Sequence, residues 1–140
     1  MAISSRFSVA AHILTLIHQN EGNRITSEYI ASSVNTNPVV IRRILGMLSK
    51  AGLVRTNAGV AGATLVRPLS EITMLDVYRA VLPDQEELFS MHEHPNPACP
   101  VGRNIQSSLD HVFVSAQRAL EAELDRVTME QVSLEVAGKA

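Results

Sequence analysis

The chain has 140 residues, of which 46% are hydrophobic and 19% are charged, so it can form one globular domain, or a small domain with an appended helix. No apolar run is long enough to span a bilayer, and a single cysteine excludes an internal disulfide framework and is typical of the reducing cytoplasm. The net charge of −2 is unevenly distributed along the chain. Residues 1–67 are basic, with seven Lys and Arg against two Glu, and residues 68–140 are acidic, with five Lys and Arg against twelve Asp and Glu. The basic part suits a polyanionic partner such as nucleic acid.

The first predicted element is a helix over residues 4–20. Arg6 before an apolar run resembles the start of a signal peptide, but His12 and Thr15 interrupt the run and no small-residue cleavage site follows. An amphipathic helix explains the stretch better, because apolar side chains recur at helical spacing at Phe7, Ala10, Ala11, Leu14 and Ile17.

A short helix, a tight turn and a longer helix follow, which is the order of a helix-turn-helix. The short helix covers residues 26–33, with Thr26 as its N-cap and with Tyr29, Ile30 and Val34 facing inward. Residues 34–36 form the turn.

The longer helix lies within residues 36–53 and has its own start and stop signals. Asn37 can cap it, Pro38 suits the first helical position, and Gly52 supplies the left-handed residue that ends it. One face carries the apolar stripe Ile41, Ile44, Leu45 and Leu48, and the other carries Val39, Arg42, Arg43, Gly46 and Lys50. An apolar back with a basic front suits insertion into a DNA major groove, although a solvated charged face is the simpler alternative.

A β-hairpin is predicted directly after this helix, with strands at residues 53–56 and 64–67 and a flexible loop at 57–63. It would form the wing of a winged helix. Small residues at its tip would let the backbone approach a minor groove closely, with Arg55 and Arg67 on either side. The alternative is a plain hairpin that only closes the core.

Pro68 ends the second strand, and a fourth helix is expected from residue 71 to 82. Its apolar positions are Ile72, Leu75, Val77, Tyr78 and Val81. Residues 83–87 form an acidic turn, and the stretch up to residue 101 is predicted to be an ordered loop because it contains Pro95, Pro97 and Pro100 and shows no period.

A single long helix is predicted from about residue 102 to 132, with a frayed tail beyond Glu135. Its apolar stripe comprises Ile105, Leu109, Val112, Ala116, Leu120, Leu124 and Val127. Such a stripe is longer than a small core can cover, so it needs a symmetric partner or, alternatively, the first helix of the same chain. The predicted fold is therefore mainly α with a small β-hairpin, divided into a winged helix-turn-helix domain (1–82), a sensor-region loop (83–101) and a dimerisation helix with its tail (102–140).

These segments resemble the Rrf2 family of bacterial winged-helix transcriptional regulators over nearly the whole chain. The similarity lies in residues 5–7 (SRF), 39–45 (VVIRRIL), 51–54 (AGLV), the wing at 59–62 (GVAG) and 96–102 (NPACPVG). The resemblance implies a homodimer that places the third helix in the major groove and the wing in the adjacent minor groove. The DNA-binding candidates are Thr26, Asn37, Pro38, Val39, Arg42, Arg43, Lys50, Arg55, Asn57, Gly59, Val60, Ala61 and Gly62.

The sequence departs from the family pattern in two places. Gly62, Ala63 and Thr64 stand where the usual wing has two glycines and an aromatic residue. Cluster-binding members carry three cysteines before the long helix, whereas this chain has Cys99 alone. One thiolate per subunit is too few for an iron–sulfur cluster, so no cofactor is expected and the chain resembles the cluster-free branch.

Cys99 is nevertheless a candidate redox sensor, because Pro100 suggests that it lies at a helix N-terminus, where the thiolate is favoured. The alternative is a buried, inert cysteine. His92, His94 and Cys99 could also ligate a metal, but their spacing matches no metal motif, and no motif identifies a small effector.

The sequence thus predicts a transcriptional repressor that binds double-stranded DNA. The alternatives are a metal-responsive regulator and a winged helix used as a protein-interaction module. No nucleophile–base pair, phosphate loop or paired carboxylates suggest an enzyme.

Overall fold

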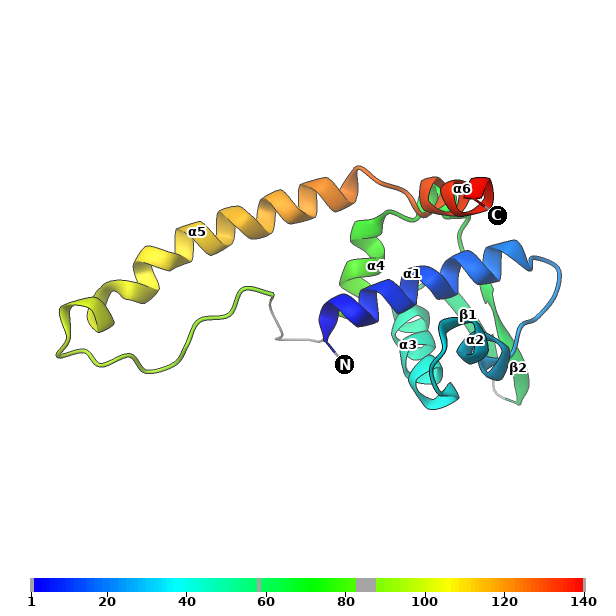
Figure 1. Cartoon of the computed structure of the whole chain (residues 1–140), viewed down its shortest axis with the longest axis horizontal. Helices are drawn as coiled ribbons and strands as arrows, with labels where there is room; N and C mark the ends of the chain where they lie inside the picture. The colour runs from blue at the N-terminus through cyan, green and yellow to red at the C-terminus, as the bar shows by residue number, and fades with distance from the viewer. Residues whose placement is uncertain (1, 58, 83–87, 140) are drawn as a thin grey trace.

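The computed structural model describes residues 2–57, 59–82 and 88–139. The elements follow in the order α1 (Ile3–Gln19), α2 (Ser27–Val34), α3 (Pro38–Lys50), β1 (Val54–Asn57), β2 (Val60–Leu65), the 3-10 turn η1 (Leu69–Glu71), α4 (Met74–Val81), α5 (Pro100–Asp125) and α6 (Met129–Lys139). Figure 1 shows that α1 to α4, the hairpin and α6 form one body, from which α5 projects. The predicted fold class, mainly α with a winged helix-turn-helix, is confirmed. None of the described helices has the length and hydropathy that a bilayer span needs.

The predicted helix caps are present in the structure. Asn37 Oδ1 accepts a hydrogen bond from the Val40 N–H at 3.1 Å, and Thr26 Oγ1 accepts one from the Tyr29 N–H at 3.0 Å. Each bond satisfies a backbone donor that the first turn of a helix leaves without a partner. The starts of α2 and α3 were therefore encoded locally.

The end of α3 also follows from local sequence. Gly52 has a φ of +77°, its N–H donates to the Ser49 carbonyl, and the Leu53 N–H donates to the Leu48 carbonyl, both at 3.0 Å. This pair of bonds is the Schellman motif, which needs a left-handed residue that glycine adopts without strain. The motif turns the chain directly into β1.

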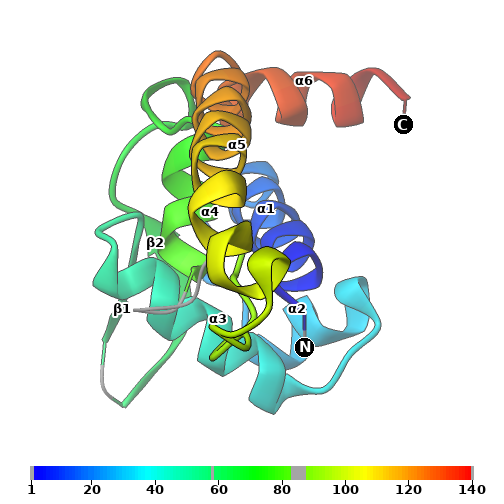
Figure 2. The same cartoon turned by 90° about the vertical axis from the view of Figure 1, so that its left-hand side faces the viewer.

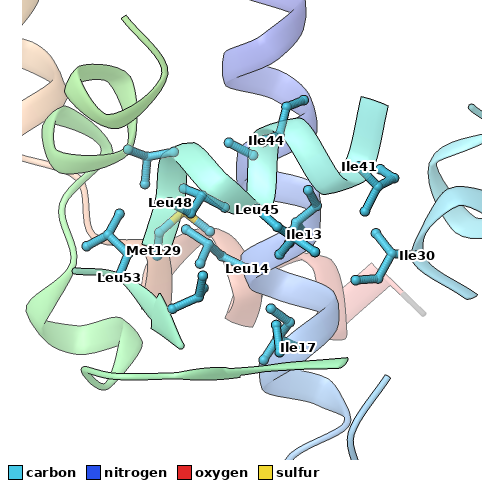
Figure 3. Close-up of a cluster of buried hydrophobic side chains, with 14 of the residues drawn as sticks. Ile13, Leu14, Ile17, Ile30, Ile41, Ile44, Leu45, Leu48, Leu53 and Met129 are labelled. Carbon is cyan, nitrogen blue, oxygen red and sulfur yellow. The ribbon is translucent and has the colours of Figure 1, made fainter. Parts of the chain in front are cut away.

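The core lies between α1, α3 and the start of the hairpin. All four residues of the predicted α3 stripe are buried, and Ile13, Leu14 and Ile17 of α1 pack in the same cluster (Figure 3). Met129 of α6 is also fully buried there, so the C-terminal helix belongs to this body. Tyr29 was predicted to face inward, but 48% of its surface is exposed, because the buried side of α2 is formed by its neighbours Ile30 and Ala31.

The hairpin differs from the prediction at both ends of its second strand. Residues 60–63 were assigned to a flexible loop, but Val60 pairs with Asn57 and Ala63 pairs with Thr56, with a register shift between the two pairs. The bulge and the positive φ angles of Gly59 and Gly62 let β2 start at Val60. It ends at Leu65 instead of Arg67, because Leu65 pairs with the first residue of β1 and the chain before that residue is the end of α3.

The single helix predicted for residues 102–132 is wrong. The chain leaves the helix after Asp125, and residues 127–129 pair with the backbone before α4. The Met74 N–H donates to the Val127 carbonyl and the Met129 N–H donates to the Ile72 carbonyl, both at 2.8 Å. This pairing turns the chain so that Met129 enters the core, which a straight helix would not allow.

The second helix, α6, then continues to Lys139, so the frayed tail predicted beyond Glu135 is also wrong. Thr128 Oγ1 accepts from the Gln131 N–H at 3.2 Å, and Gln131 Oε1 accepts from the Thr128 N–H at 3.0 Å. This capping box has the sequence form T-x-x-Q, which is the local signal that could have revealed the break. The predicted acidic turn at 83–87 lies outside the described residues.

Candidate nucleic-acid interface

The exposed face of α3 carries the side chains that the sequence predicted for it. Arg42, Arg43 and Lys50 are exposed, and Val39 is 61% exposed beside them. Because the opposite face of the helix is buried in the core, this face is held rigidly toward solvent. Asn37 and Pro38 begin the helix at its edge, and the Asn37 side chain is engaged in the cap.

The wing lies beside this face of α3. Figures 1 and 2 both show α3 and the far end of the hairpin at the same edge of the body, with α6 at the opposite edge. Arg55 and Asn57 are exposed on β1, and Val60 is 50% exposed on β2. Gly59 has a φ of +75° with open space around it, as expected for the end of a wing. The Ala61 side chain lies outside the described residues.

Three predicted positions have evident structural roles. Thr26 caps α2, and its hydroxyl is already bonded to the Tyr29 N–H. A Cβ at position 62 would lie 2.8 Å from the Ile25 carbonyl oxygen. Glycine at this position therefore allows the segment between α1 and α2 to pack against the edge of β2. Arg67, predicted to flank the wing, points instead to Asp76 at the start of α4, with Nη2 3.5 Å from Oδ2.

A hollow of about 410 Å³ opens between α2, α3 and the wing. Gly46 keeps it open, since a side chain at this point of α3 would project into empty space. Its lining comprises Ser27, Glu28, Arg42, Leu45, Gly46, Thr56, Val60 and Gly62. A groove beside an exposed basic helix can accept part of a duplex backbone or base edge.

Sequence reasoning missed one charged residue of this surface. Glu28 of α2 reaches across to α3, and its Oε1 lies 2.8 Å from Arg42 Nη2. The two residues are fourteen positions apart, so no helical spacing rule could pair them. Arg43, Lys50 and Arg55 have no ion-pair partner within residues 2–57, 59–82 and 88–139. Among the described residues, this surface therefore presents three cations without an ion-pair partner and one, Arg42, that is paired.

Cys99 forms a second candidate site, at the far end of α5 from the body. It is the N-cap residue of α5 and its thiol is exposed. Hydrogen bonding from the backbone N–H groups of Gly102 and Val101 lowers the pKa of the Cys99 thiol below its ordinary value. The predicted position at a helix N-terminus is confirmed.

No set of three or more His, Cys, Asp or Glu side chains in the described ranges is arranged to hold a metal ion. His92, His94 and Cys99 are not grouped in such a set within these ranges, so metal binding by them stays a hypothesis of the sequence. The backbone carbonyl of His92 accepts a hydrogen bond from Gln106 Nε2 at 2.9 Å.

A polar network joins α4 to α5 beside a hollow of about 590 Å³. Gln117 Nε2 lies 3.2 Å from Tyr78 Oη and 3.0 Å from Glu121 Oε2, and Arg79 Nη2 donates to Glu121 Oε1 at 2.9 Å. The bonds from Arg79 and Gln117 lower the pKa of Glu121. This network holds α5 against the body.

Comparisons with known proteins bear on the family and the fold of the chain. The Rrf2 family, described as iron-dependent transcriptional regulators, matches residues 3–135. YwnA of Bacillus subtilis strain 168, described as an HTH-type transcriptional regulator, is 52% identical over 130 residues, which are 93% of this chain and 96% of YwnA. A crystal structure described as that of a DNA-binding protein is 46% identical, covers 91% of this chain and 97% of its own, and superposes with a TM-score of 0.74. A transcriptional regulator from Lactobacillus plantarum is 26% identical over 94% of this chain and 89% of its own, with a TM-score of 0.76.

Proposed function

This chain belongs to the Rrf2 family of DNA-binding transcriptional regulators, and we propose that it is a homodimeric repressor of a two-fold symmetric operator. It is a regulator and not an enzyme. Since a repressor must reach the chromosome, the proposed place of action is the cytoplasm.

The exposed basic face of α3 is the observation that carries the proposal. Its buried back fixes the helix, and Arg42, Arg43 and Lys50 face solvent beside the wing. We expect α3 to enter the major groove, where arginine can bind guanine through two hydrogen bonds. Arg55 and the hairpin end at Gly59 would then meet the adjacent minor groove.

The shape of α5 supports a dimer. It has 26 residues and none of them is buried, and Val101 and Val112 are 67% and 49% exposed. An apolar helix surface of this length is stabilised when a second copy covers it. In such a dimer each subunit supplies one α3, so the half-sites should lie about one helical turn, roughly 34–36 Å, apart.

The family description names iron, but the donors in this chain do not fit an iron–sulfur cluster. A cluster needs about four protein ligands, and Cys99 is the only cysteine. The described residues also offer no group of three His, Cys, Asp or Glu placed to hold an ion. We therefore assign the chain to regulators that work without a cluster.

The proposed signal is oxidation of Cys99. Its thiol is exposed and its pKa is lowered, so the thiolate can attack hydrogen peroxide. The O–O bond breaks, one oxygen stays on sulfur as a sulfenic acid, and the other leaves as hydroxide. Because Cys99 starts the helix proposed for dimerisation, a change there can alter the separation of the two DNA-binding bodies.

The proposal is tested by selecting DNA from a random library and measuring binding of the best duplex and of a scrambled duplex against salt. Tight binding of the selected duplex with a steep salt dependence supports the regulator, because phosphate contacts release counterions. Arg43→Ala should weaken it, while Arg103→Ala, which removes an exposed arginine from α5, is the matched control. Binding without salt dependence or preference would favour the protein-interaction module. Loss of binding after mild oxidation in the parent, but not in Cys99→Ser, tests the thiol.

A further inference from the structure

The pair formed by Glu28 and Arg42 is an unusual feature on a surface that meets a polyanion. The carboxylate lies on the same side as the unpaired cations and borders the hollow between α3 and the wing. A negative charge there repels DNA phosphates and weakens binding to any sequence. A residue with that effect needs a compensating role.

Stability of the fold does not supply that role. The Glu28 and Arg42 side chains are 65% and 56% exposed, and ion pairs with such exposure contribute little to folding. The contact between α2 and α3 is already secured by buried apolar residues, among them Ile30, Ala31 and Ile41. The first turn of α2 favours an acidic residue, but that effect does not require Glu28 to reach α3.

The geometry points to selectivity. From these contacts we infer that Glu28 is a specificity-determining residue, which positions Arg42 for a base edge and keeps it from phosphates. The inference rests on the proposed role of α3 in the major groove. The guanidinium group has five N–H donors, so Nη2 can stay with Glu28 while the other donors contact a base.

Arg42 would contact different groups on random DNA and on the operator. The other N–H donors of Arg42 can also reach a phosphate, but the Glu28 carboxylate held beside them repels the negative charge of that phosphate. On the operator, Arg42 contacts its base while still held by Glu28, and the held side chain loses less conformational freedom on binding. Glu28 therefore lowers affinity for random sequence more than affinity for the operator.

The test compares Glu28→Ala with Glu21→Ala, which removes the same charge from an exposed site in the loop after α1, where Glu21 contacts His18. Release of one further counterion predicts that Glu28→Ala binds a scrambled duplex about eightfold more tightly at 0.1 M salt. Glu28→Ala also removes the carboxylate that holds Arg42 in place for guanine. Loss of that arginine–guanine contact predicts operator binding weakened by about fivefold or more, before the electrostatic gain is added. Because the electrostatic gain applies to both duplexes, the ratio of operator affinity to scrambled affinity should fall about fivefold or more, and Glu21→Ala should change it by less than about twofold.

The double variant Glu28→Ala with Arg42→Ala separates the mechanism from general charge effects. If Glu28 acts through Arg42, removing Glu28 from the Arg42→Ala protein should leave the operator-to-scrambled ratio unchanged. An unchanged ratio in Glu28→Ala, or an equal loss on both duplexes with a lower Tm, overturns the inference. If the parent protein itself does not prefer its selected duplex, the proposed function fails first, which is a distinct result.

Discussion

Gly62→Ala should destabilise the protein through a collision beneath the wing. Gly62 has a φ of +94°, and a Cβ there would lie 2.8 Å from the Ile25 carbonyl oxygen and 2.9 Å from the Arg24 Cβ. Both distances are shorter than van der Waals contact allows. The chain before α2 would have to move away from β2, which breaks the bridge between Ile25 and Ala63.

The expected cost has two parts. Left-handed backbone costs a residue with a Cβ roughly 1–2 kcal/mol. Displacing the backbone at Ile25, which is buried, adds roughly 1–2 kcal/mol through lost packing and a lost hydrogen bond. Gly62→Ala should therefore lower the free energy of unfolding by about 2–4 kcal/mol.

Gly22→Ala is the matched control. Gly22 also has a positive φ, +89°, but no atom lies within 4 Å of a Cβ built there, so only the backbone cost of roughly 1–2 kcal/mol applies. Urea unfolding followed by circular dichroism measures both variants on one scale. Equal losses in the two variants would refute the collision, and no loss in Gly62→Ala would refute the strain as well.

Three further predictions concern the caps, the core and the thiol. Asn37→Ala removes the bond to the Val40 N–H and should cost about 1 kcal/mol in urea unfolding, with a cost near zero contradicting the observed cap. Met129→Ala should cost about 2–5 kcal/mol, because the fully buried side chain leaves a cavity; a loss below that range would show that α6 does not complete the core. The thiolate forms as pH rises through the thiol pKa, so the lowered pKa of Cys99 predicts faster alkylation by iodoacetamide at neutral pH in the native protein than in urea, and the opposite order would contradict it.

The position and orientation of α3 could be predicted before the fold was known, because every signal for this helix is local. Asn37 and Gly52 act on backbone groups within a few residues, and the stripe from Ile41 to Leu48 follows from helical spacing alone. The exposed positions of Arg42, Arg43 and Lys50 are the complement of that stripe. Local sequence signals were therefore enough to predict which face of α3 is exposed to solvent.

The contacts that join different segments could not be predicted in this way, because they depend on how the chain folds. The break before α6 depends on Val127 and Met129 pairing with the segment before α4, and the pairing of Glu28 with Arg42 depends on how α2 packs on α3. The structural role of Gly62 likewise depends on the approach of Arg24 and Ile25. Each of these contacts joins two segments that no helix or strand periodicity relates to one another. Such a contact forms only when the core has folded.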